Sequence, residues 1–326
     1  MAPPNPLDMA ASGVRTLRAF GRRFPVGGDV LAPSLEGAVS GRTVLITGAS
    51  SGIGKSTALK IGEAGGTVLL VARTKEKLDE VARQIEDLGG IAYVHPANLS
   101  EMDDIDRMAA EVLEQHGHVD VLINNAGKSI RRSIDRSYER FHDFQRTMQV
   151  NYFGPVKLIL DVLPTMRERQ SGHIVNISTI GLQVNTPRFA AYVASKAALD
   201  AFSRVIASEV KDDKVHITTI NMPLVRTPMI APTRMYDMFP AITPEEAAEM
   251  IAKAMVNRPK KVATKLGNFG ELLYAVAPKA SDSILNTAYK LFPDSQAAKG
   301  KESEGRDKAP STEAVAFAHL MKGVHW

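Results

Sequence analysis

The chain has 326 residues, of which 44% are hydrophobic and 23% charged, a composition typical of a soluble globular protein. It contains no cysteine, which excludes disulfides, zinc–thiolate sites, iron–sulfur clusters and a cysteine nucleophile. The net charge of +4 comes without Lys/Arg runs interleaved with aromatics, so nucleic acid is not expected as a partner. The eight histidines lack metal-ligand spacing, and no apolar run reaches ~18 residues. We therefore expect no metal site, no membrane-spanning helix and a cytoplasmic protein.

Residues 1–40 are expected to form an arm. Three early prolines disfavour helix at its start, and residues 9–24 then carry apolar side chains at helical spacing with arginines around the rest of the wheel. One interpretation is a basic amphipathic helix docked on its own domain or on a partner subunit. The other is peripheral contact with a membrane surface or a lipid substrate.

From residue 41 to 265, short apolar runs alternate with amphipathic helices. This pattern predicts an α/β domain with a doubly wound, Rossmann-like parallel sheet, buried on both faces. The expected strands are 43–47, 67–72, 91–94, 119–123, 173–177, 215–220 and 261–264. The expected helices are 53–63, 75–88, 102–116, 138–169, 190–210 and 245–256.

Residues 266–326 are expected to form a C-terminal helical extension. Apolar side chains recur at helical spacing over residues 270–292. Residues 294–310 are polar and charged, which predicts a flexible linker. A short helix is expected over residues 311–322.

A glycine-rich turn follows the first strand. Gly48 permits a tight turn, Gly52 lets the backbone approach a pyrophosphate, and Gly54 lets the next helix pack close to the strand. The N-terminus of that helix favours phosphate. The second strand ends at Arg73 with no carboxylate, and a guanidinium can bind a 2′-phosphate with help from Ser51 and Lys77. We therefore predict NADP(H); a solvated surface arginine is the alternative for Arg73.

Tyr192 and Lys196 are four residues apart and share one face of a helix. An ammonium group beside a phenol stabilises the phenolate, so Lys196 is expected to lower the Tyr192 pKa. The pair would then act as a proton donor at neutral pH. The alternative is a buried aromatic beside a lysine that extends to water.

These motifs together resemble those of the short-chain dehydrogenase/reductase family, from about residue 42 to 264. The resemblance implies a catalytic tetrad of Asn151, Ser178, Tyr192 and Lys196. Around the cofactor it implies contacts from Gly48, Ser50, Ser51, Gly52, Ile53, Gly54, Arg73, Asn98, Asn125, Ala126, Gly127, Tyr192, Lys196, Pro223, Val225 and Thr227. It also implies a homo-oligomer.

The sequence departs from the family pattern at three places. Ser178 lies one position further from Tyr192 than usual, and Thr179 sits at the usual offset; counting back from Gly181 favours Ser178. Asn98 replaces the acidic residue often found after the third strand, which leaves adenine recognition open. Leu224 replaces a glycine, while Thr227 remains where it could touch the nicotinamide amide.

Residues 185–204 and 222–233, and the closing His325-Trp326, are similar to those of bacterial fatty acyl-CoA reductases. This narrower resemblance implies NADPH-dependent reduction of a long-chain acyl-CoA to the fatty aldehyde. Ser178 and Tyr192 would hydrogen-bond the thioester carbonyl oxygen. Lys196 would hold the nicotinamide ribose, and Asn151 would position a water that relays protons. Whether the aldehyde is reduced further stays open.

The loop at residues 224–241 is rich in Met, Ile and Phe, side chains that suit an acyl chain; a loop that covers the core is the alternative. Arg188, Arg226 and Arg234 are candidate partners for CoA phosphates or else surface charges. Two other functions stay open. One is a reductase or dehydrogenase of another lipid carbonyl or alcohol, such as a sterol, retinoid or β-ketoacyl group. The other is an NADP(H)-binding protein without turnover.

Overall fold

The sheet of this protein has seven parallel strands in the order β3-β2-β1-β4-β5-β6-β7. In the computed structural model, the residues described are 34–231, 236, 239–292 and 294. Within them the strands are β1 (Thr43–Thr47), β2 (Thr67–Ala72), β3 (Ile91–Pro96), β4 (Val121–Asn124), β5 (Gly172–Thr179), β6 (Val215–Met222) and β7 (Lys261–Val262). The predicted doubly wound Rossmann-like sheet is confirmed.

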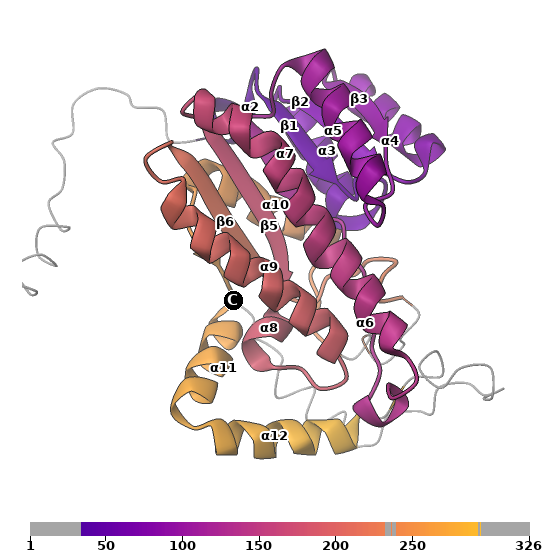
Figure 1. The fold of residues 1–326 in the computed structure, drawn as a ribbon, viewed down its shortest axis with the longest axis vertical. Helices are drawn as coiled ribbons and strands as arrows, with labels where there is room; N and C mark the ends of the chain where they lie inside the picture. The colour runs from indigo at the N-terminus through magenta and orange to yellow at the C-terminus, as the bar shows by residue number, and fades with distance from the viewer. Residues whose placement is uncertain (1–33, 232–235, 237–238, 293, 295–326) are drawn as a thin grey trace, which may run out of the picture. The chain divides into compact units, whose positions relative to one another are not determined.

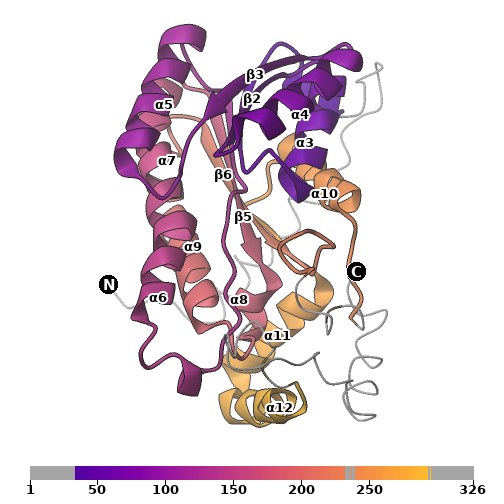
Figure 2. The same ribbon diagram turned by 90° about the vertical axis from the view of Figure 1, so that its right-hand side faces the viewer.

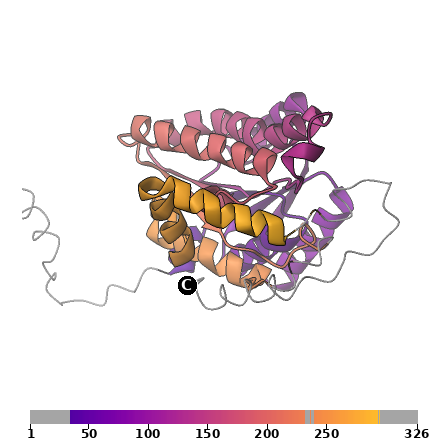
Figure 3. The ribbon, with the colours of Figure 1, turned by 90° about the horizontal axis from the view of Figure 1, so that it is seen from below.

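Helices cover both faces of the sheet, as Figures 2 and 3 show. One face is covered by α5 (Met102–His116), α7 (Gly154–Glu168) and α9 (Ala190–Glu209), and the other by α2 (Leu35–Val39), α3 (Gly52–Glu63), α4 (Lys75–Asp87) and α10 (Pro244–Asn257). The remaining helices are α6 (Phe141–Met148), α8 (Ile180–Val184), α11 (Lys265–Val276), α12 (Pro278–Leu291) and the short turns η1 (Ile134–Arg136) and η2 (Gln149–Phe153).

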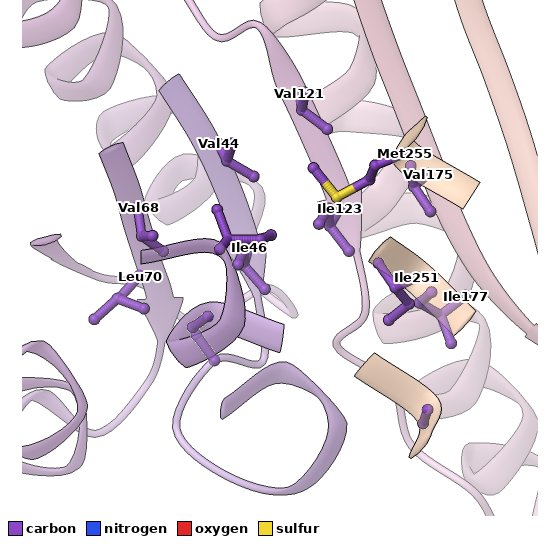
Figure 4. Close-up of a cluster of buried hydrophobic side chains, with 14 of the residues drawn as sticks. Val44, Ile46, Val68, Leu70, Val121, Ile123, Val175, Ile177, Ile251 and Met255 are labelled. Carbon is purple, nitrogen blue, oxygen red and sulfur yellow. The ribbon is translucent and has the colours of Figure 1, made fainter. Parts of the chain in front are cut away.

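The core lies in two layers, one on each side of the sheet. Strand residues alternate between the layers because successive side chains point to opposite faces. Val44 and Ile46 of β1 belong to the layer beneath α3 and α10, together with Ile251 and Met255 of α10 (Figure 4). Leu45 of β1 belongs to the opposite layer, with α5 and α7. Burial on both faces explains why β1, β2 and β4 read as continuous apolar runs.

The long helix expected over residues 138–169 is continuous from residue 141 to 168 and contains a π-helical turn. Helix α6 passes into the π-helical turn η2, and α7 follows from Gly154. A Cβ on Gly154 would meet the backbone oxygen of Leu99 at 2.6 Å, so only glycine permits this close approach. Wide π turns of this kind are frequently found at functional sites.

Helices α11 and α12 lie beyond the ends of β5 and β6 (Figure 1). Helix α11 packs on α8, where a Cβ on Gly267 would meet Oε1 of Gln183 at 2.2 Å. The end of the expected arm also differs, because residues 35–39 form α2, which contacts α3 and α10 and buries Val39. The amphipathic segment 9–24, the linker 294–310 except for Asp294, and the helix 311–322 lie outside the described residues. Among the helices described, none is long and apolar enough to cross a membrane.

Candidate active site

The glycine-rich turn joins β1 to α3. Gly48 and Gly52 have positive φ angles of +68° and +53°, which favour glycine. A Cβ on Gly54 would lie 2.2 Å from the carbonyl oxygen of Gly48, so a side chain here would force the helix away from the strand. Ser51 is the N-cap residue of α3, and its side chain makes no capping hydrogen bond to the described residues of this helix. The first N–H groups of α3 therefore remain available to an anion, and the turn fits the pyrophosphate of a dinucleotide.

The segment after β4 supports this turn. The Thr47 hydroxyl accepts hydrogen bonds from the backbone N–H groups of Asn125 and Ala126, both at 3.0 Å. Nδ2 of Asn125 donates to the carbonyl oxygen of Thr47 at 2.9 Å. These contacts place the Asn125–Gly127 segment against the glycine turn. Ser50 and Ile53 belong to the same turn and are partly exposed.

The residues expected near the adenosine half follow β2 and β3. Arg73 is exposed directly after β2, and Lys77 in the first turns of α4 is also exposed. Asn98 follows β3; its backbone N–H donates to Asp104 at 2.6 Å and its Oδ1 accepts from the N–H of Ser100 at 3.2 Å. Asn98 therefore holds this loop through its backbone N–H and its side-chain oxygen. Neither contact requires a carboxylate at position 98.

The loop after β6 contacts the same turn. A Cβ on Gly52 would meet Cγ2 of Thr227 at 3.1 Å, so Thr227 lies directly on the glycine turn. Val225 is buried and forms a β-bridge with Ile242, which holds both ends of the loop together. Pro223 is buried between β6 and Val225. The segment after β4 and the loop after β6 therefore both contact the glycine turn.

Asn151 is fully buried in η2. Its amide accepts from the N–H of Lys128 at 2.8 Å and donates to the carbonyl oxygen of Lys128 at 2.9 Å. It also donates to Oγ of Ser195 at 2.9 Å, and that hydroxyl donates to the carbonyl oxygen of Tyr192 at 2.7 Å. The π turn therefore links the segment after β4 to the helix that carries Tyr192 and Lys196.

Lys196 is buried, and its Nζ donates to the carbonyl oxygen of Ile177 at 2.7 Å. Burial lowers the pKa of Lys196 to about 8. A Cβ on Gly127 would lie 3.3 Å from Oδ1 of Asn151 and 3.6 Å from Nζ of Lys196. Asn151, Gly127 and Lys196 therefore lie close together in the structure.

The pKa of the Tyr192 phenol is shifted in the opposite direction from the one that the sequence indicates. Burial raises the pKa of Tyr192 to about 12, and a hydrogen bond with the Thr179 hydroxyl acts in the opposite direction. The expected lowering of the pKa by Lys196 is wrong for this structure, because the ammonium group is directed to the Ile177 carbonyl and desolvation dominates. The phenol is therefore protonated at neutral pH.

The hydroxyl beside Tyr192 belongs to Thr179, not to Ser178. Oγ of Ser178 is buried and has no hydrogen-bond partner among the described residues. The two side chains point to opposite sides of β5 because they are consecutive on a strand. The assignment of Ser178 as the catalytic hydroxyl therefore stays a prediction, and Thr179 is a second candidate for that role. In the sequence, Thr179 has the usual spacing from Tyr192.

The structure adds Tyr236 to the surroundings of the Tyr192 phenol and changes the interpretation of Arg188. Burial raises the pKa of Tyr236 to about 12, the Arg131 guanidinium opposes this, and the Tyr192 phenolate adds to it. Tyr236 therefore lies within electrostatic range of Tyr192, a proximity that no local sequence pattern indicates. Arg188 is buried in an ion pair with Asp294 and does not offer an exposed cation to a CoA phosphate. Arg226 is exposed, and Arg234 lies outside the described residues.

The arrangement brings the buried amine of Lys196, on the helix that carries the Tyr192 phenol, close to Gly127 in the segment that supports the glycine turn. A family model described as short chain dehydrogenase matches residues 42–236. The chain belongs to the short-chain dehydrogenases. As a member of this family it is a nicotinamide-dependent oxidoreductase. Within the described part of this short-chain dehydrogenase, no cluster of His, Asp or Glu could hold a metal ion.

Relatives of this short-chain dehydrogenase span almost its whole length. It is 51% identical over 288 residues to a fatty acyl-CoA reductase of Acinetobacter baylyi, covering 88% of this chain and 96% of the relative. It is 49% identical over 329 residues to an uncharacterized oxidoreductase of Mycobacterium tuberculosis, covering 98% and 96%. Among solved structures, a metagenomic short-chain oxidoreductase in complex with NADP matches with a TM-score of 0.61 and 32% identity, covering 69% of this chain and 97% of that one.

Proposed function

We propose that this protein is an NADPH-dependent reductase that converts a long-chain fatty acyl-CoA to the fatty aldehyde and free CoA. The observation that carries the proposal is the similarity to a fatty acyl-CoA reductase across nearly all of that relative's length. The residues of the candidate site support it, because they include a proton donor, Tyr192, and a glycine turn that fits a dinucleotide. The sequence contains no cysteine, so a route through a cysteine-bound thioester does not apply.

Bound NADPH would supply a hydride to the carbonyl carbon of the thioester. The hydroxyls of Thr179 and Tyr192 would donate hydrogen bonds to the carbonyl oxygen and stabilise its developing negative charge. Tyr192 would then transfer its proton to that oxygen. Lys196 would hold the cofactor ribose and Asn151 a water for reprotonation. When the carbon–sulfur bond breaks, CoA leaves and aldehyde forms, with one NADPH and one proton consumed for each thiol released.

Arg73 supports NADPH as the cofactor. It is exposed at the end of β2, where the 2′ position of the ribose lies in this fold, and no carboxylate competes there. Lys77, on the helix that follows β2, and Ser51, in the glycine turn, are also exposed. A guanidinium pairs with a phosphate through two parallel hydrogen bonds, which ribose hydroxyls do not reproduce.

The loop after β6 supports an apolar substrate. Met229 is exposed on it, and the ring of Phe239 packs against Phe292 with centroids 5.2 Å apart. Flexible apolar side chains suit an acyl chain.

A homo-oligomer is also part of the proposal. Phe153 on η2, Leu160 on α7 and Val205 on α9 are exposed apolar side chains that a second subunit could cover.

The test is incubation with NADPH and palmitoyl-CoA while the loss of NADPH and the appearance of free thiol are followed together. One thiol for each NADPH indicates aldehyde, and one thiol for every two NADPH indicates further reduction to the alcohol. NADPH loss with a β-ketoacyl, sterol or retinoid substrate, and no thiol from palmitoyl-CoA, would replace the proposal with another lipid carbonyl. Tight NADPH binding without turnover of any of them would indicate a binding protein.

A further inference from the structure

Three loops follow the strands that carry the site, and each contacts Phe292 or Asp294, just after the end of α12. The loop after β4 reaches Asp294 through Ser133, whose N–H and Oγ donate to the carboxylate at 3.2 and 2.6 Å. The segment between β5 and α9 reaches it through Arg188, whose Nε lies 3.1 Å from Oδ1. The loop after β6 reaches Phe292 through Phe239. Phe292 and Asp294 together therefore contact all three loops.

The ion pair between Arg188 and Asp294 is buried. The Arg188 side chain is 7% exposed and that of Asp294 is 8% exposed. Nη1 of Arg188 also donates to the carbonyl oxygen of Tyr289 at 2.9 Å, and the guanidinium lies 3.8 Å from the centre of the Tyr289 ring. Removal of one partner from a buried pair leaves the other charge uncompensated, so this contact holds its two segments firmly together.

Arg188 occupies a backbone conformation that a non-glycine residue rarely adopts, with φ at +70°. Its carbonyl oxygen accepts from the N–H of Arg132 at 2.7 Å. Helix α9 starts two residues later, and the ring of Phe189 packs against Tyr192 with centroids 6.3 Å apart. The contacts of Arg188 with Asp294 and Arg132 therefore hold the residues that directly precede Tyr192.

Phe292 connects the remaining loop. Its carbonyl oxygen accepts from Nη2 of Arg131 at 3.0 Å, and its buried ring packs on Phe239. The N–H of Phe239 donates to the carbonyl oxygen of Tyr236 at 3.2 Å. Tyr236, which lies within electrostatic range of Tyr192, is thus connected through Phe239 to Phe292.

We propose that Phe292 and Asp294 form a clasp that holds together the loop after β4, the segment between β5 and α9, and the loop after β6. Asp294 is then a positioning residue for Tyr192. The inference rests on the proposed function for its kinetic consequence. Asp294 acts through Arg188 and the start of α9, so its substitution should change kcat, the rate of the chemical step. Phe292 acts through the loop after β6, so its substitution should change KM for the substrate.

The experiment compares Asp294→Asn with wild type in the full chain. We expect kcat with palmitoyl-CoA to fall by roughly tenfold or more, because small misplacement of a reacting group is costly. The NADPH dissociation constant should change less than twofold, since the glycine turn is not part of the clasp. Backbone hydrogen exchange should accelerate at residues 128–137 and 185–191. Asp294→Glu, which keeps the charge, should recover most of kcat, and Asp282→Asn is the matched control on an exposed face of α12.

Phe292→Leu separates the two parts of the clasp. It should raise KM for palmitoyl-CoA several-fold and leave exchange at residues 185–191 unchanged. If Asp294→Asn does not fold, Ser133→Ala removes one hydrogen bond to the same carboxylate and should accelerate the same exchange. Unchanged exchange and unchanged kcat in a folded Asp294→Asn protein would overturn the clasp. A wild type that releases no thiol but shows faster loop exchange in Asp294→Asn would overturn the proposed function and keep the clasp.

Discussion

Nζ of Lys196 donates a hydrogen bond to the carbonyl oxygen of Ile177, 2.7 Å away, at the end of β5. This contact joins the helix that bears Tyr192 to the central sheet. It also keeps an amine in a buried position, which lowers its pKa to about 8. The contact therefore has a consequence for stability as well as for chemistry.

The stability of the protein should rise with pH because of Lys196. Its pKa is about 8 when folded, against about 10.4 when unfolded. Between these values the unfolded chain binds more protons, so the free energy of unfolding increases by about 3 kcal/mol from pH 8 to 10.5. Urea unfolding of wild type and Lys196→Met at pH 7.5, 9 and 10 measures it. The difference in unfolding free energy should grow in favour of wild type; a constant difference would contradict the buried charge.

Thr179→Ala should lower kcat about a hundredfold, because one donor to the carbonyl oxygen is lost. Ser178→Ala should stay within a few-fold of wild type, because Oγ of Ser178 has no hydrogen-bond partner in the part of the chain described here. Steady-state rates of NADPH loss with palmitoyl-CoA compare the two variants directly. The reverse order of severity would restore Ser178 to the role that the sequence pattern favours.

Tyr192→Phe should remove turnover and leave NADPH binding nearly intact. The variant loses only the phenolic proton donor, and general acids contribute roughly 10²–10⁴-fold to rate. Titration of the cofactor fluorescence and the thiol-release assay together measure it. Tyr236→Phe is the matched control, since it removes a neighbouring phenol of similar pKa. Full activity in Tyr192→Phe would refute the assigned acid.

Arg73→Ala should raise KM for NADPH by roughly tenfold to a hundredfold, since charge-assisted hydrogen bonds are worth about 1.5–3 kcal/mol. KM for NADH should barely change, because NADH lacks the 2′-phosphate. Arg83→Ala is the control, an exposed arginine on the adjacent helix α4. Equal efficiency of wild type with both cofactors would remove the basis for the prediction.

The sequence alone determined the sheet, the glycine turn and the Tyr192–Lys196 pair, because their signals are local. Apolar runs, glycines and a four-residue spacing depend on a strand, a turn and a single helix. The tertiary structure decided which hydroxyl lies beside Tyr192, since consecutive strand residues face opposite sides and their orientation depends on sheet packing. It also decided the pKa of Tyr192, because burial depends on neighbours distant in sequence. The partner of Arg188 lies 106 residues further along the chain, and no local pattern could have indicated it.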